Sequence, residues 1–184
     1  GVLYGALFVW KWKLPTLFLL TAGTIGLLYS LWFTPFSVPD EMDHFDTAYY
    51  YANVVLGHPL KTESGAMLKR TCDLKAVDIY TMLPTADTYQ AQAESLSAPV
   101  GDTGMVETTG RRVNRFPFLY AFATLGMVIG RLLGLGLVPL YYLARLFNFA
   151  FFLLTIYWAL KKMPFGKMVL FAIALLPMTM HLAC

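Results

Sequence analysis

The residues best suited to chemistry gather in one stretch, "SVPDEMDHFDTAYYYA", from Ser37 to Ala52. Five ionisable side chains occur there within seven positions: Asp40, Glu41, Asp43, His44 and Asp46. The preceding segment, residues 14–38, contains no Asp, Glu, Lys, Arg or His. Because about 20 apolar residues suffice to cross a bilayer, this acidic cluster is predicted to lie where a membrane span ends.

Asp40 and Glu41 are the candidate catalytic residues. Adjacent carboxylates at the edge of a bilayer, fixed by Pro39, suit the removal of a proton from a hydroxyl group whose reaction partner is lipid-bound. Carboxylates also bind hard cations, and Asp43 and His44 follow Asp40 by three and four positions. Asp40, Asp43 and His44 are therefore the candidate ligands of a divalent metal ion.

The element that positions these residues is predicted to be an amphipathic helix over about residues 39–56. Ser37 is the expected N-cap, with Pro39 in the first turn and acidic residues where the helix dipole favours them. One face is apolar: Phe45, Tyr49, Ala52 and Leu56. The other is polar: Asp40, Asp43, His44 and Thr47. We expect the helix to lie along the outer membrane surface, with its apolar face toward lipid, its carboxylates toward a cleft and Asp46 solvated.

Composition assigns the chain to the membrane proteins. Of the 184 residues, 58% are hydrophobic and only 14% are charged, whereas soluble domains carry about 25% charged residues. The predicted fold is all-α and transmembrane, the N-terminal helices of a polytopic bundle with about four spans. These spans cover residues 14–38, 116–136, 138–160 and 167–184. Since the chain starts with Gly and ends inside an apolar run, we expect it to be incomplete.

Residues 39–115 form a large first loop, which we place outside the cytoplasm because "WKWK" at residues 10–13 is typical of a cytoplasmic flank. All 11 acidic residues of the chain lie in this loop. The excess of basic residues therefore lies elsewhere, and we expect no nucleic-acid partner. The three lysines of "KKMPFGK", residues 161–167, favour the cytoplasm although four spans would place them outside. An alternative therefore stays open, in which residues 116–133 form a re-entrant or surface helix.

Further features predict packing and local order. Gly126, Gly130 and Gly134 recur every four residues, a spacing that permits close helix packing within one bundle. Arg131 and Arg145 lie within apolar runs, where an arginine is costly unless it is paired or its side chain snorkels to the headgroups. For Arg145, which lies one turn from Asn148, we expect structural pairing. The stretch "ESLSAPVGDTGMVETTG", residues 94–110, is predicted to be irregular. Cys72 and the C-terminal cysteine are poorly placed to form a disulfide.

Five segments carry a resemblance to known membrane proteins: "PDEMDHFDTAYYYA", "NRFPFLYAF", "GRLLGL", "LARLFNFAFFLLTIYWALKKMPFGK" and "IALLPMTM". An acidic pair just after the first span, opening an external loop, is similar to the GT-C class of membrane glycosyltransferases. The fuller pattern resembles a bacterial family of polytopic proteins known as domain of unknown function 2142. The resemblance implies sugar transfer from a polyprenyl-phosphate-linked donor to a cell-envelope glycan or lipid acceptor. The reaction would occur at the outer face of the inner (plasma) membrane, sometimes with a divalent metal ion. The resemblance assigns the base to Asp40 or Glu41, of which we favour Asp40 by a narrow margin and keep both.

Donor binding requires cations near the outer headgroups, and Arg111, Arg112 and Arg115 precede the second span. With Asp43 and His44 they are the predicted substrate-binding residues. Two other classes stay open: a transporter or flippase segment for a lipid-linked glycan, and a non-catalytic membrane subunit whose external loop binds a partner. A polar path through several spans would favour transport, whereas a groove open to lipid beside Asp40 would favour an enzyme.

Overall fold

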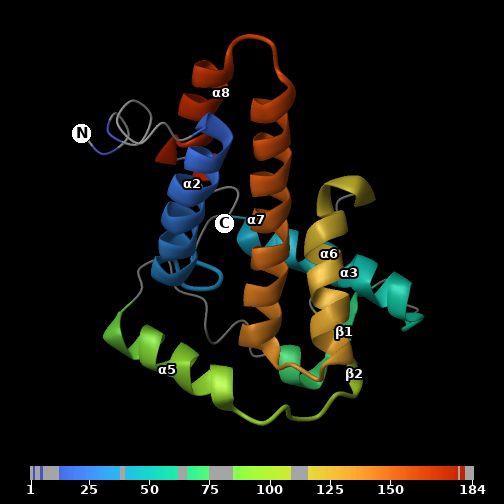
Figure 1. Ribbon diagram of the computed structural model, residues 1–184. Coiled ribbons are helices and arrows are strands. Elements are labelled where there is room, and N and C mark those ends of the chain that lie inside the picture. Colours follow the sequence, from blue (N-terminus) through green and yellow to red (C-terminus); the bar gives the residue numbers. More distant parts are fainter. Residues whose placement is uncertain are drawn as a thin grey trace. The chain divides into compact units, whose positions relative to one another are not determined.

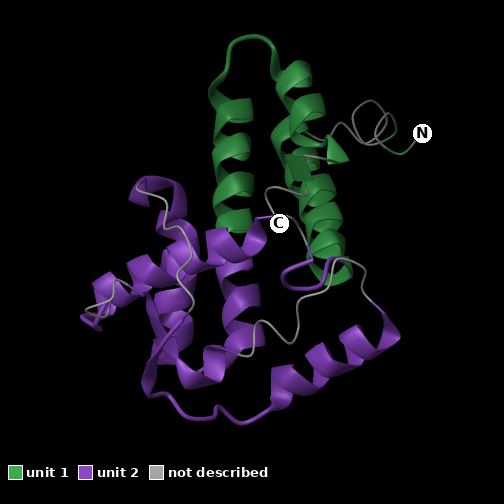
Figure 2. Ribbon diagram, turned by 180° about the vertical axis from the view of Figure 1, so that it is seen from behind, with its two compact units in different colours: residues 1–32, 148–184 green, residues 33–147 purple. Residues whose placement is uncertain are grey.

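The computed structural model describes most of the chain and divides it into two compact units (Figure 2). Unit 1 comprises Gly1–Trp32 and Asn148–Cys184, and unit 2 comprises Phe33–Phe147. The described residues are 2, 5, 13–37, 40–61, 66–74, 85–108, 116–177 and 179–180.

The described residues are mostly helical, as predicted, with one small sheet in addition (Figure 1). The helices are α2 (Leu14–Trp32), α3 (Glu41–Leu56), η2 (Thr71–Asp73), α5 (Ala86–Ser97), α6 (Pro117–Leu132), α7 (Leu137–Lys162) and α8 (Lys167–Ala174). The strands are β1 (Leu68–Arg70) and β2 (Met105–Glu107). They pair antiparallel, with Leu68 opposite Glu107.

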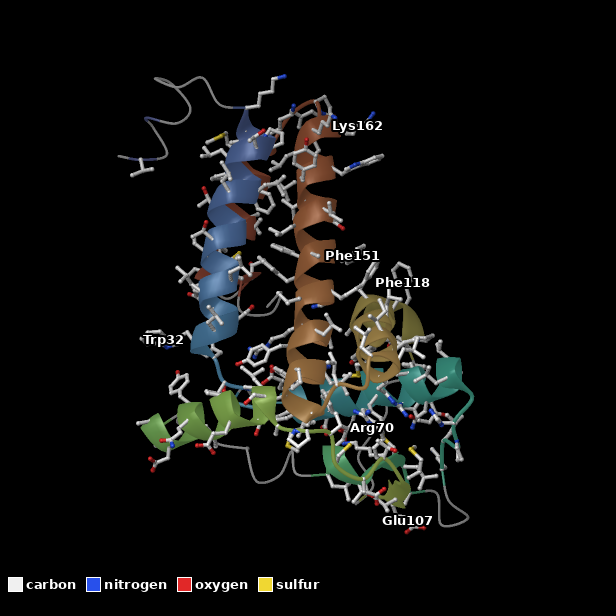
Figure 3. The ribbon with its side chains drawn as sticks, turned by 60° about the horizontal axis from the view of Figure 1, so that its bottom comes forward. Trp32, Arg70, Glu107, Phe118, Phe151 and Lys162 are labelled. Atoms are coloured by element: carbon white, nitrogen blue, oxygen red, sulfur yellow. The ribbon has the colours of Figure 1, made fainter. Side chains whose placement is uncertain are left out.

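Unit 1 is held together by apolar packing between α2, the C-terminal part of α7 and α8. Its buried core contains Leu17, Phe18, Ala22, Phe149, Leu160, Phe171, Ala174 and Met180. Phe18 makes edge-on contacts with Phe152 and Phe171, each at 6.2 Å between ring centroids. Figure 3 shows Trp32 and Lys162 at opposite ends of this unit's long helices. The fit depends on shape, because a Cβ at Gly26 would lie 2.1 Å from the Phe149 ring.

In unit 2, α3 packs against α6, and the N-terminal part of α7 completes the core. A Cβ at Gly126 would lie 2.8 Å from the backbone of Ala144, so α6 and α7 approach each other closely there. Gly134 has a φ of +68° in the corner between the two helices, a conformation that glycine adopts without steric cost. The close helix packing that the glycine spacing predicted is therefore confirmed within unit 2.

Two described helices are long and apolar enough to cross a membrane, α2 with 19 residues and α7 with 26. The 16 residues of α6 extend about 24 Å, less than the roughly 30 Å of a hydrocarbon core. The α8 helix has 8 residues. Two of the four predicted spans thus coincide with helices of spanning length, whereas the count of four and the external position of the loop stay predictions.

The segment predicted to be irregular, residues 94–110, is partly ordered. Its first four residues complete α5, whose N-cap Thr85 forms a capping box with Thr88. Residues 105–107 form β2. The prediction was wrong here because a polar helix with a strong cap needs no apolar periodicity, and because a three-residue strand depends on a partner distant in sequence.

Candidate functional site

The turn before α3 departs from the predicted cap. The helix begins at Glu41 with Asp40 as N-cap residue, at φ 62° and ψ −1°, in the left-handed region. Ser37 does not cap it, and its Oγ instead donates a hydrogen bond of 2.8 Å to the carbonyl oxygen of Thr34. The chain reverses within residues 34–37, where Phe36 also has a positive φ, so the Ser37 hydroxyl is used before the helix starts.

Glu41 is bound by two residues of α7. Its Oε1 accepts a hydrogen bond of 2.7 Å from Arg145 Nη2 and another from the Tyr141 hydroxyl. Arg145 Nη1 also donates to the carbonyl oxygen of Phe33, at 2.7 Å. The guanidinium carbon lies 4.8 Å from the centroid of the Tyr141 ring. These contacts attach both ends of the turn, Phe33 and Glu41, to one arginine.

The two candidate carboxylates therefore have different surroundings. Asp40 is exposed, whereas the Glu41 side chain keeps only 16% of its accessible surface and forms an ion pair. Glu41 Oε1 is already engaged by Arg145 and Tyr141, whereas the exposed Asp40 carboxylate is accessible from solvent. Asp40 is thus the better placed of the two to take a proton, and Glu41 is placed to hold the turn.

Asp43 and His44 lie one turn along α3, where their amides donate to the carbonyl oxygen of Asp40 at 3.0 and 3.1 Å. His44 is exposed, and its Nδ1 lies 2.8 Å from the Tyr120 hydroxyl on α6. Among the described residues, no three His, Cys, Asp or Glu side chains are grouped to hold a metal ion. The residues present thus do not fit the predicted metal site of Asp40, Asp43 and His44.

The family comparison covers this region. The model of the family DUF2142, described as a predicted membrane protein, matches residues 24–184. The chain belongs to this family. No curated protein and no solved structure matches it significantly. The family match includes all of unit 2, and so the Asp40 turn and its contacts with α7 belong to the DUF2142 region.

The apolar face of α3 in this DUF2142 protein was correctly predicted, but what covers it was not. Phe45, Tyr49 and Ala52 are buried, with exposed fractions of 5%, 0% and 0%. They pack in the core of unit 2 with residues of α6 and α7. The helix therefore turns its apolar face toward protein, not toward lipid.

Asp46 was predicted to be solvated and is instead buried, with 2% exposure. Its Oδ1 forms an ion pair with Lys69 of β1, which is itself 6% exposed. The Lys69 ammonium lies 5.6 Å from the Phe45 ring. The partner follows 23 residues later in the chain, which is why helical periodicity alone assigned Asp46 to solvent.

A second buried network was not predicted. Arg70 binds Asp73 through two hydrogen bonds, Nε to Oδ2 at 2.7 Å and Nη2 to Oδ1 at 3.0 Å. The Tyr49 hydroxyl donates to the same Oδ2, at 2.7 Å. Arg70 Nη2 also donates to the carbonyl oxygen of Leu135 at the α6–α7 corner. Figure 3 marks Arg70 beside α3.

This network changes the acidity of its members. Burial, and then the charge of Asp73, raise the pKa of Tyr49, so its hydroxyl stays protonated and serves as a donor. Burial also raises the pKa of Cys72, a free cysteine next to Asp73. The only sequence signal for the network was the ionic density of "LKRTCDLK", which has no helical or strand periodicity.

The structural pairing predicted for Arg145 is confirmed, whereas for Arg131 the sequence had left pairing and snorkelling open. Arg145 pairs with Glu41, and Arg131 Nη1 donates to Asn53 Oδ1 at the other end of α3. The three further arginines, Arg111, Arg112 and Arg115, lie outside the described residues, so their predicted role in donor binding stays a prediction.

Proposed function

We propose that this chain is a GT-C-like glycosyltransferase, or the N-terminal part of one. It would transfer a sugar from a polyprenyl-phosphate-linked donor to a cell-envelope acceptor at the outer face of the membrane. The observation that supports this proposal most is the exposed Asp40 carboxylate, held in a left-handed turn beside the buried Glu41–Arg145 pair. Membership of a predicted membrane protein family agrees with a lipid-linked substrate.

In the proposed reaction, Asp40 takes the proton of the acceptor hydroxyl as that oxygen bonds to the anomeric carbon of the donor sugar. The bond between the anomeric carbon and the donor phosphate oxygen breaks, and its electron pair leaves with the phosphate. The proton ends on Asp40 and is later lost to water. A positioned general base of this kind contributes about 10²- to 10⁴-fold to a rate.

Glu41 acts as a positioning residue. A non-glycine residue in the left-handed region costs about 1–2 kcal/mol and persists only where its surroundings fix it. The contacts of Glu41 and Phe33 with Arg145 provide that constraint on both sides of Asp40. Asp43 and His44, one turn further along α3, are assigned to contacts with the acceptor.

The contacts of the two arginines support an enzyme over a transporter. A path for a charged glycan requires ionisable groups that face an opening within the spans. Arg131 and Arg145 are the arginines of the described apolar helices, and both form hydrogen bonds with residues of α3. They are therefore engaged in holding α3.

The proposal is tested by sugar transfer in membranes from cells that express the chain. Radiolabelled hexoses and pentoses on undecaprenyl phosphate serve as donors, and label in lipid-free glycan is counted. Asp40→Asn should lower transfer at least about 100-fold with unchanged expression. Asp87→Asn, an exposed carboxylate on α5, is the matched control and should keep full activity. Full activity in Asp40→Asn would refute the proposal, and translocation of the donor without transfer would favour a flippase.

A further inference from the structure

The C-terminal end of α3 meets α6 at a second charged position, distant along the helix from Asp40. Arg131 is half-buried there, and its guanidinium carbon lies 4.8 Å from the centroid of the Tyr49 ring. Its Nη1 donates to Asn53 Oδ1. Asn53 also accepts, through its backbone oxygen, a hydrogen bond of 3.0 Å from the amide of His58. The buried Asn53 thus accepts hydrogen bonds from the Arg131 guanidinium and from the backbone amide of His58.

Arg131 differs from the other buried cations of unit 2 because no described carboxylate lies within ion-pair distance of it. The ion pairs among described residues use Lys69, Arg70 and Arg145. A guanidinium has five N–H donors, and an amide oxygen supplies no opposite charge. The Asp73 carboxylate acts on Arg131 from beyond ion-pair distance and is bound to Arg70, so net positive charge remains at this end of α3. This charge acts on the exposed His58 imidazole. The pKa of His58 is lowered by burial and then by the charges of Arg131 and Arg70.

Aliphatic side chains on both helices flank this charge. Val54 and Val55 follow Asn53 on α3, with exposed fractions of 50% and 65%. Leu132 and Leu133 follow Arg131, with 72% and 68%. Single exposed apolar residues are ordinary, but four of them beside a cation at the end of an apolar helix match the boundary between headgroups and acyl chains.

We propose that Arg131 and His58 bind the phosphodiester of an anionic phospholipid, with these four aliphatic side chains against its acyl chains. The guanidinium provides paired donors that fit phosphate oxygens, and the imidazole adds one more. A free phosphate would use the same donors but would leave the aliphatic residues in water, so a lipid is the better match. This site is independent of the proposed transferase reaction.

The test measures thermal unfolding of the full chain in a nonionic detergent as lipid is added. The additions are dioleoylphosphatidylglycerol, dioleoylphosphatidylcholine and inorganic phosphate, each titrated separately. Phosphatidylglycerol should raise the unfolding temperature of the wild type, with at least about tenfold weaker apparent binding in Arg131→Gln. His58→Gln should weaken binding less. Lys161→Gln removes an exposed cation in unit 1 and should bind like the wild type.

Because Arg131→Gln also loses the contact with the Tyr49 ring, two further variants keep the test decisive if it fails to fold. Arg131→Lys keeps the charge with fewer donors and should bind with intermediate affinity. His58→Gln changes an exposed residue beyond the helix and should keep the fold. Unchanged phosphatidylglycerol binding in both would overturn the proposal. Equal stabilisation by phosphatidylcholine or by inorganic phosphate would overturn it as well.

Discussion

The two units of this membrane protein bury different kinds of side chain. Unit 1 packs aromatic and aliphatic side chains from three helices, and none of its described residues is both charged and buried. Unit 2 buries four charged side chains, Asp46, Lys69, Arg70 and Asp73. It adds the Glu41–Arg145 pair, whose side chains are 16% and 9% exposed.

This difference means that the two units hold their helices in position by different kinds of contact. Apolar packing positions a helix through the shapes of the side chains that meet, whereas hydrogen-bonded ion pairs also specify which side chains face one another. In unit 2, two ion pairs include a residue of α3, Glu41 with Arg145 and Asp46 with Lys69. A third pair, Arg70 with Asp73, contacts α3 through the Tyr49 hydroxyl. The unit that presents Asp40 is therefore the one in which the position of α3 is specified by charge. Removing a charge from unit 2 and changing the shape of a side chain in unit 1 should therefore have different effects on stability.

The largest effect on stability is expected from Asp73→Ala in unit 2. The change leaves Arg70 buried without a carboxylate and removes the acceptor of the Tyr49 hydroxyl. Breaking a buried pair in this way costs about 3–5 kcal/mol of unfolding free energy. The measurement is detergent-mediated unfolding, followed by far-UV circular dichroism. Asp87→Ala, on the exposed face of α5, should change stability by about 0.5 kcal/mol or less, and equal losses in the two variants would contradict the account of unit 2.

A smaller effect is expected from Gly26→Ala in unit 1, where the new Cβ would overlap the Phe149 ring. Overpacking of this kind costs about 1–3 kcal/mol. Gly23→Ala, one turn earlier on α2, is the matched control, because nothing lies within 4 Å of its Cβ position. It should be neutral or slightly stabilising. A second change, Phe149→Leu, should restore part of the stability lost in Gly26→Ala, and no recovery would show that shape does not limit unit 1.

The smallest effect concerns pH and again separates the units. The folded-state pKa of His58 is lowered by burial and by the charges of Arg131 and Arg70, so the unfolded chain binds more protons near pH 6.5. The contribution of His58 to stability is therefore present above that pH and is lost as pH falls through it. Between pH 7.5 and 5.5, His58→Gln should lose less stability than the wild type. An identical slope in both proteins would contradict the lowered pKa.

The parts of the fold that sequence predicted are those set by local pattern. The apolar face of α3, with Phe45, Tyr49 and Ala52, follows from a helical repeat. The close approach of α6 and α7 follows from the spacing of Gly126, Gly130 and Gly134, and the long apolar helices follow from composition. Each of these signals comes from residues that are close together in the chain.

The parts that sequence missed depend on partners distant in the chain. Asp46 looked like a solvated acid because Lys69, its partner, lies on a strand that needs residues 105–107 to form. Asp40 and Glu41 looked equivalent because their difference arises from Arg145, 104 residues after Glu41. Charge density in a loop signals that ionic contacts exist, but it does not say which side chains form them.

Chemical rescue of transfer by formate tests most directly whether Asp40 is the base and Glu41 its support. Sugar transfer is measured for Asp40→Ala and Glu41→Ala with rising formate concentration, which supplies a carboxylate that fits the truncated side chain. Formate should restore transfer in Asp40→Ala, because that position is open to solvent, and should leave Glu41→Ala unchanged, because Arg145 and the turn are displaced there. Rescue of Glu41→Ala, or none for Asp40→Ala, would contradict the division of roles between the two carboxylates.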